Sequence, residues 1–436
     1  MKNIIFFFML LVIAGGAFGQ TAATSELNVD GVKVIFKPTQ KQIVNVSVYF
    51  RGGTSNYPAE MDGIENLALH GALDCGTATY PTAVFKDKAD LIGARISAEV
   101  GRDDSWISLN CISKYFNDGW DLLASAVTKP VFAEADLGNV KEKIIGALKS
   151  EDANPDSRLR MLAMTTAFEG TPYAMNPAGN AAAITAFTAQ QVKDYYFQTL
   201  LNKSRLFIVV VGNVDKDDIT AKIKAAFGGL PAGSYTAHAM QGMPSFGGKP
   251  VKTEDRKLAT NYIMGIVNAP PFDSPDYVPF LLAIWELHGI LYTEIRTKRH
   301  LSYAPSADVH EALMPYADVY VSTSDPKESV SVMCGVLKML RKFDLANRSL
   351  DQIKALYITG KYREEQSTDA IAESLGRAEV LGGWELAEQL PDLIQKVTRA
   401  GINDAFNRYV TGIDWVYLGD AGKEQEAEES FAKKIY

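Results

Sequence analysis

Residues 63–77 read Gly-Ile-Glu-Asn-Leu-Ala-Leu-His-Gly-Ala-Leu-Asp-Cys-Gly-Thr, and this segment decides how the rest of the chain is interpreted. Its apolar residues recur at helical spacing, so one face of the helix would point toward a core. These residues are Ile64, Leu67, Ala68, Ala72 and Leu73. Asp62 precedes the segment at the position of a helix N-cap. The pattern therefore predicts an amphipathic helix that packs on one side.

On such a helix Asn66 and His70 are four residues apart and share a face, with Leu69 beside them. The segment resembles the helix of the pitrilysin/insulinase-type zinc peptidases, the inverted zincins, whose signature is H-x-x-E-H. In that family the two His bind zinc and the Glu is the general base. Here Asn66 replaces the first His and Leu69 replaces the Glu, so only His70 remains. The resemblance is therefore to a catalytically degenerate member.

The family's third zinc ligand is a Glu on a later helix, and the resemblance places its equivalent near Gly146 and Ala147. No carboxylate stands there, although Glu142 is one helical turn away. A catalytic zinc needs three protein ligands, an open position and a base. We therefore expect no bound metal and no catalytic residue in this chain, and His70 as a pocket-lining or core side chain. A less favoured alternative is an unorthodox site of His70 with Glu142 or Glu65.

The N-terminus has the composition of a secretory signal peptide. Lys2 gives a positive start, residues 4–14 form an apolar run, and Ala17-Phe18-Gly19 gives a small-x-small cleavage site. We therefore expect residues 1–19 to be removed and the mature chain to be soluble, in the periplasm or otherwise exported. No later stretch is predicted to be long and apolar enough to form a membrane helix.

The overall composition is that of a globular protein, with 22% charged and 47% hydrophobic residues. The net charge of −8 and the lack of a basic patch argue against nucleic-acid binding. The three Cys, at positions 75, 111 and 334, have no close spacing and are predicted to be buried thiols.

The remaining pattern predicts an α+β protein in which the order of elements repeats. In the first half we expect strands at 31–37, 43–50, 94–100, 105–111 and 206–211, and helices at 85–92, 114–127, 136–150, 155–168, 189–200 and 215–227. In the second half we expect strands at 261–267, 302–309, 316–323 and 415–418, and helices at 274–298, 327–341, 350–366, 369–381 and 403–410. This repeated order predicts an internal duplication of two related domains, each a largely antiparallel sheet covered by helices.

The segment 229–250 is rich in Gly, Pro and Ser and is the predicted linker between the two domains. The N-terminal domain, which carries the degenerate zinc motif, would then cover residues 20–228. The C-terminal domain would cover residues 251–436. The resemblance to the pitrilysin type spans the whole mature chain, because that family is also built from two related domains.

A second motif lies at the end of the predicted helix 274–298, which Ser274 and Pro275 would cap. Arg296 and Tyr303 are separated by six residues, the spacing of a family pair that holds the substrate peptide and helps to stabilise the transition state. A guanidinium can donate to a peptide carbonyl, and a phenol can donate to a developing oxyanion. The structural alternative is that Arg296 only closes the helix and Tyr303 packs in a strand.

In some bacterial members of the family, one subunit carries H-x-x-E-H and another carries the Arg–Tyr pair. The resemblance implies that this chain is the second kind, a non-catalytic subunit that binds peptide substrate for an H-x-x-E-H partner holding the zinc. Strand 94–100 corresponds to the family's substrate-pairing edge strand, although an ordinary sheet strand is an equally good interpretation. The alternative function is a peptide-binding or scaffold protein of the same fold without a peptidase role.

Overall fold

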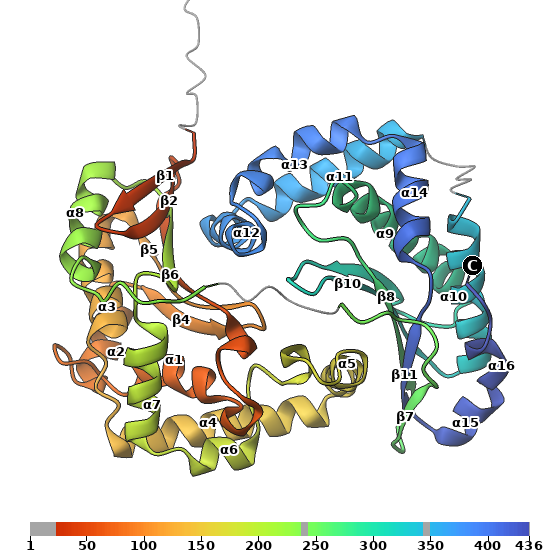
Figure 1. Ribbon diagram of the computed structural model, residues 1–436, viewed down its shortest axis with the longest axis horizontal. Coiled ribbons are helices and arrows are strands. Elements are labelled where there is room, and N and C mark those ends of the chain that lie inside the picture. Colours follow the sequence, from red (N-terminus) through yellow and green to blue (C-terminus); the bar gives the residue numbers. More distant parts are fainter. Residues whose placement is uncertain (1–22, 237–242, 343–348, 436) are drawn as a thin grey trace, which may run out of the picture.

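The computed structural model describes residues 23–236, 243–342 and 349–435. The predicted signal peptide at 1–19 and part of the predicted linker lie outside these residues. The chain forms two lobes, each built on one sheet, with helices both outside and between the sheets (Figure 1).

The sheet of the first lobe has the strand order β1-β2-β6-β3-β5-β4. Its strands are β1 (Ser25–Val29), β2 (Val32–Pro38), β3 (Ile43–Arg51), β4 (Arg95–Val100), β5 (Asp104–Ile112) and β6 (Leu206–Gly212). Strands β2 and β6 pair in parallel and all other neighbours are antiparallel. The strand that the resemblance identified as an edge strand, β4, does lie at an edge of this sheet.

The sheet of the second lobe repeats this plan with the order β7-β11-β8-β10-β9. Its strands are β7 (Lys252–Asp255), β8 (Asn261–Asn268), β9 (Ser306–His310), β10 (Tyr316–Thr323) and β11 (Asp414–Gly419). Strands β7 and β11 are its one parallel pair, as β2 and β6 are in the first sheet. The predicted α+β fold of two related domains is therefore confirmed, and β1 is an addition to the repeat.

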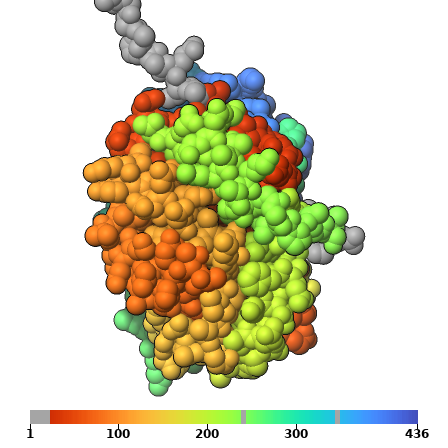
Figure 2. Space-filling model, turned by 90° about the vertical axis from the view of Figure 1, so that its left-hand side faces the viewer, coloured from red at the N-terminus to blue at the C-terminus, as the bar shows by residue number. Residues whose placement is uncertain are grey.

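The first half contributes the helices that cover the outer side of the first lobe (Figure 2). They are α1 (Ile64–Asp74), α2 (Thr82–Leu91), α3 (Phe116–Thr128), α4 (Glu134–Ala153), α5 (Pro155–Ala167), α6 (Ala181–Ala186), α7 (Ala189–Tyr195), which continues as a π-helical turn at Tyr196–Leu200, and α8 (Lys216–Phe227). Of these, α5 leaves the first lobe and lies beside β11 in the second (Figure 1).

The second half contributes a corresponding series. It consists of α9 (Tyr277–Leu291), the π-helical turn η6 (Tyr292–Thr297), α10 (Pro326–Leu340), α11 (Leu350–Glu364), α12 (Thr368–Leu381), α13 (Glu385–Lys396), α14 (Arg399–Tyr409), α15 (Ala421–Glu426) and α16 (Glu428–Phe431). Within it, α12 crosses to the first lobe and covers the inner face of its sheet (Figure 1).

This exchange of helices explains why the central strand β6 is apolar throughout. In β6, Ile208 and Val210 face the core under α1 and α3, whereas Phe207 and Val209 pack against α12. Both faces of the strand are thus buried, which removes the alternation of a half-exposed strand. The sequence predicted β6 as a buried strand but not the helix from the other half that buries it.

Two predicted helix caps were wrong. The N-cap of α1 is Gly63 in place of Asp62, and its φ of 89° lies in the left-handed region. Only glycine fits there, because a Cβ on Gly63 would lie 2.7 Å from the Cα of Gly179. Helix α9 begins after Asp276, so Ser274 and Pro275 stand outside it. The sequence also missed β1, β7, α6 and α13.

We expected no later stretch to be long and apolar enough to form a membrane helix, and this expectation was wrong for one helix. Tyr277–Thr297 has 21 residues and a mean hydropathy of 1.2, which is long and apolar enough. Half of this stretch is buried inside the protein, where α9 packs against β9, α10 and α14. The three Cys are buried free thiols, as predicted.

Candidate functional site

The side chains that replace two of the signature residues are both buried on α1. Leu69 is completely buried in the core of the first lobe, and Asn66 is only 5% exposed. The Nδ2 of Asn66 donates a hydrogen bond to the carbonyl oxygen of Ala178 at 3.0 Å. The amide therefore fastens α1 to the segment before α6, and its Oδ1 is at best a weak neutral metal ligand.

His70 is half-buried on the same helix. Burial lowers the pKa of its imidazole because it disfavours the charged ring, and the nearby carboxylate of Asp74 opposes this shift. Asp74 is itself paired with Lys86 at 2.9 Å and Lys143 at 3.2 Å. The acidic neighbour of His70 is therefore already neutralised by two lysines.

The segment that should hold the third ligand lies on the exposed side of α4. Gly146, Ala147 and Glu142 are all exposed, and a Cβ placed on Gly146 would meet no atom within 4 Å. The site has therefore lost its distant carboxylate without another group filling the space.

Glu65, the other carboxylate considered for an unorthodox site, is turned into the core. It accepts hydrogen bonds from Ser105 Oγ at 2.5 Å, Tyr195 OH at 2.6 Å and Asn56 Nδ2 at 3.0 Å. Burial raises the pKa of Glu65, although these three donors favour its charged form. Its acceptors are used within the lobe, so Glu65 anchors α1 instead of facing His70.

Taken together, these side chains do not fit a zinc ion. Asn66 offers at best one weak neutral oxygen, Leu69 is apolar, and the carboxylate is missing from α4. Among the residues that the structure describes, no three His, Cys, Asp or Glu side chains lie where they could hold a metal. We derive no catalytic step through a metal in this chain, and its inability to bind zinc stays a prediction.

The structure brings Arg296 and Tyr303 together. The guanidinium carbon of Arg296 lies 4.0 Å from the centre of the Tyr303 ring and 4.8 Å from that of Tyr292, so it sits between two aromatic rings. Tyr303 is 78% exposed. Arg296 forms no ion pair within the described ranges, so its donors remain available to a ligand.

The backbone around this pair is irregular. Arg296 lies in the π-helical turn η6, and His300 has a left-handed φ of 56°. Turns of this kind redirect side chains and are frequent at functional sites. The sequence predicted neither the π turn nor the contact with Tyr292, because both depend on backbone geometry.

The pair and the remnant motif occupy equivalent places in the repeat. Helix α1 follows β3, and α9 follows β8, the strand at the same position in the second sheet. Helices α1 and α9 lie in different lobes (Figure 1), and the contacts described for Arg296 and Tyr303 do not include His70. The roles of both residues stay predictions.

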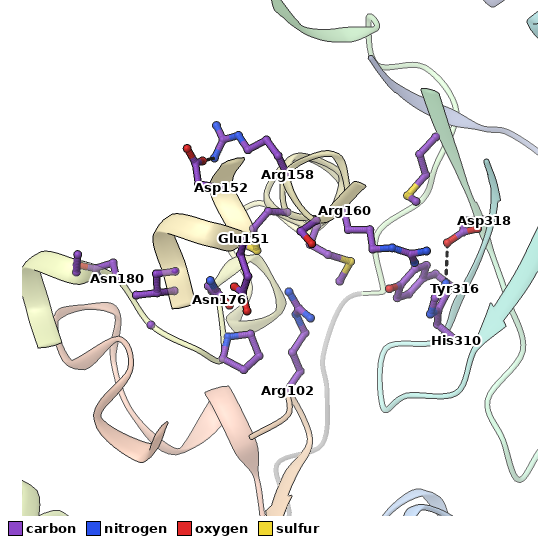
Figure 3. A pocket seen from close by; sticks show the side chains of 18 residues that line it. Arg102, Glu151, Asp152, Arg158, Arg160, Asn176, Asn180, His310, Tyr316 and Asp318 are labelled. Carbon is purple, nitrogen blue, oxygen red and sulfur yellow. Dashed lines mark hydrogen bonds and ion pairs between the residues drawn. The ribbon is translucent and has the colours of Figure 1, made fainter. Parts of the chain in front are cut away.

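The sequence analysis also missed a cavity of about 580 Å³ between the two lobes (Figure 3). Its charged lining includes Arg102, Arg160 and the pair His310–Asp318. These residues come from four separate elements and have no motif spacing, so only the fold brings them together.

Comparisons with known families match most of the chain. Residues 33–180 match the family described as insulinase, peptidase family M16. Residues 186–357 match the family described as the peptidase M16 inactive domain.

Among curated proteins, an uncharacterised zinc protease of Rickettsia felis is 21% identical over 386 residues, which are 85% of this chain and 90% of that protein. Subunit 1 of the human mitochondrial cytochrome b-c1 complex is 20% identical over 256 residues, 58% of this chain and 53% of that protein.

Among solved structures, a peptidase M16 inactive domain from Pseudomonas fluorescens has a TM-score of 0.80 at 19% identity, covering 92% of this chain and 98% of that one. The periplasmic protease PqqL from Escherichia coli has a TM-score of 0.73 at 14% identity, covering 96% of this chain and 49% of that one.

Proposed function

Because the chain belongs to peptidase family M16 as a degenerate member, we propose that it is the non-catalytic subunit of an exported heterodimeric zinc peptidase. One observation carries the proposal. The side chains for a metal are lost from α1 and α4, whereas Arg296 and Tyr303 are kept, in contact and accessible.

In this assembly the partner subunit carries H-x-x-E-H and the zinc, which activates the attacking water. This chain supplies Arg296 and Tyr303 across the interface. The guanidinium donates to a carbonyl of the bound peptide, and the Tyr303 hydroxyl donates to the oxyanion that develops during attack. Each role needs a side chain with free donors, and neither group forms a hydrogen bond or ion pair with another residue that the structure describes.

Peptide binding would also use the edge of the first sheet. Strand β4 pairs with β5 on one side only, so its other side can add an extended peptide. Its exposed residues include Arg95 and Glu99.

Different observations support the two further parts of the proposal, export of the chain and its pairing with a second subunit. The signal-like N-terminus motivates export, and one protein of the same fold is a periplasmic protease. Pairing follows from the family resemblance, and one relative is by its name a subunit of a larger complex.

The test is cleavage of a quenched-fluorophore peptide library by the H-x-x-E-H chain encoded nearest to this gene, with and without this protein. We expect cleavage only with both chains, and its loss with a chelator. Arg296→Ala should lower kcat by about tenfold or more without loss of partner binding. Tyr303→Phe should do the same while keeping the aromatic ring. Arg299→Ala is the matched control, because Arg299 is three residues away and is paired with Glu294.

If the partner is equally active alone, Arg296 and Tyr303 have a structural role here, and the peptide-binding or scaffold function replaces this proposal. Peptidase activity of the isolated chain that a chelator stops would contradict its non-catalytic role.

A further inference from the structure

The cavity between the lobes is independent of the Arg296–Tyr303 pair and of α1, none of which lines it. Its walls are the C-terminal part of α4, α5 and residues 176–181 on one side, and β8 to β10 on the other (Figure 3). Its volume of about 580 Å³ is within the range of small-molecule sites.

Two arginines enter this cavity without acidic partners. Arg102 donates through Nε to the carbonyl oxygen of Tyr173 at 2.9 Å and forms no ion pair with any described residue. Burial lowers its pKa, and the nearby Tyr316, Tyr173 and Asp103 oppose this shift without forming an ion pair with it. Arg160 has neither an ion pair nor a hydrogen bond within the described chain.

The two guanidinium groups enter the same cavity. Figure 3 shows Arg102 rising from one wall and Arg160 extending across the cavity toward Tyr316. Both cations oppose the effect of burial, which raises the pKa of the Tyr316 hydroxyl. Two positive charges with free donors thus line one cavity.

Arg158 provides an internal comparison on the same helix. It also lines the cavity, but its Nη2 lies 2.6 Å from Oε2 of Glu254 and its Nη1 lies 3.2 Å from Oδ1 of Asp152. The guanidinium of Arg158 is therefore neutralised by two carboxylates of the chain, those of Glu254 and Asp152. Arg102 and Arg160 have none, which leaves them for a ligand.

The opposite wall is held rigid by three side chains of the second lobe. His310 Nε2 lies 2.7 Å from Oδ2 of the buried Asp318, and the His310 ring stacks on Tyr316 with centroids 4.3 Å apart. This arrangement positions Tyr316 as a fixed surface opposite the arginines.

The rest of the lining determines the ligand class. Apolar contacts come from Leu148, Met161, Met164 and Met264, and methionines adapt to varied shapes. The carboxylates of Glu151 and Asp318 also line the cavity and disfavour a polyanion. The lining suits a molecule with one negative group and an apolar body.

We propose that this cavity binds a small organic carboxylate, with its charged group held by Arg102 and Arg160 and its apolar part packed on the methionines.

The experiment is isothermal titration calorimetry of the full mature chain with N-acetyl-leucyl-leucine, its C-terminal amide and inorganic phosphate. We expect the free carboxylate to bind, and the amide to bind at least about tenfold more weakly because the charge-assisted hydrogen bonds are lost. Arg160→Gln should weaken binding by a similar factor. This change is compatible with folding, because the side chain has no ion pair or hydrogen bond with any residue that the structure describes.

Arg363→Gln is the matched control, since it removes the same charge from an exposed position on α11, away from the cavity. It should leave the affinity unchanged. The proposal is overturned if the dipeptide does not bind, if Arg160→Gln binds it as well as the wild type does, or if phosphate binds equally tightly. The measurement uses no partner and no peptidase activity, so its outcome is separate from that of the heterodimer.

Discussion

Glu379 on α12 lies 2.5 Å from Nη2 of Arg51 on β3, so an ion pair joins a helix of the second half to the sheet of the first. The same carboxylate oxygen lies 2.8 Å from Nζ of Lys33 on β2. The Glu379 side chain is only 5% exposed, whereas those of Arg51 and Lys33 are 22% and 33% exposed. The exchanged helix is thus fixed by charge as well as by apolar packing.

Glu379→Ala should lower the free energy of unfolding by about 2–3 kcal/mol. Removing one partner of a fully buried pair costs about 3–5 kcal/mol, and the two cations left here can recover part of their hydration. Urea unfolding followed by far-UV circular dichroism measures the change. Asp392→Ala, on the exposed side of α13, is the control and should change stability by less than about 0.5 kcal/mol.

Gly376 is where α12 comes closest to the first sheet. A Cβ on this residue would lie 2.1 Å from Cζ of Tyr49, so Gly376→Ala forces the helix away from β3. We expect a loss of about 2 kcal/mol or more, as for overpacking of a core. Gly360→Ala, on α11, meets no atom within 4 Å and should raise stability by about 0.5–1 kcal/mol. Equal melting temperatures of the two variants would contradict this close approach.

The fold was predictable because its signals are local. Helix α1, the all-apolar β6 and the repeated order of elements follow from periodicity. The exchange of α5 and α12 between the lobes could not be predicted, because a helix buried on two sides has the same sequence pattern whichever sheet it covers. Gly63 was missed as a cap because its role depends on Gly179, far along the chain.

The functional residues also fall into those that the sequence predicts and those that only the fold reveals. Asn66, Leu69 and the absence of a carboxylate at Gly146 can be read from a motif with fixed spacing. The cavity arginines cannot, because Arg102 and Arg160 are brought together by a turn and a helix with no sequence relationship.

The pH dependence of the free energy of unfolding should show the titration of Asp104 on β5. Burial raises the pKa of this carboxyl to about 7, with Asp103 and Glu65 adding to the rise and Arg377 and Arg51 opposing it. Since the folded-state value lies above the ordinary 3.8, the folded protein holds the proton more tightly. Stability should therefore fall as pH rises from about 4 to about 7, by about 2–4 kcal/mol.

Asp104→Asn should remove this contribution. In urea unfolding, the stability of the variant relative to the wild type should therefore rise between about pH 4 and about pH 7. Asp121→Asn, at an exposed position on α3, is the matched control for the loss of one carboxylate. If the wild type and Asp104→Asn differ by a constant amount, Asp104 does not titrate in this range.

Zinc content gives a direct check on the degenerate motif. The mature chain dialysed against zinc should retain far less than one equivalent by atomic absorption, because one imidazole is a weak site. The double variant Asn66→His, Leu69→Glu should also stay below one tightly held equivalent, since α4 offers no carboxylate at Gly146. One tightly held equivalent in the wild type would contradict our interpretation of α1.

The Arg296–Tyr303 pair should contribute little to folding. An exposed cation–π contact is worth about 0.5–1 kcal/mol, so Arg296→Ala and Tyr303→Ala should each lower the free energy of unfolding by no more than about 1 kcal/mol. Tyr196→Ala, which removes a fully buried ring, should cost about 3–5 kcal/mol in the same urea titration. A loss above about 2 kcal/mol for Arg296→Ala would mean that the pair closes helix α9 and is kept for stability. A small loss leaves substrate contact as the reason for an unpaired guanidinium between two tyrosines.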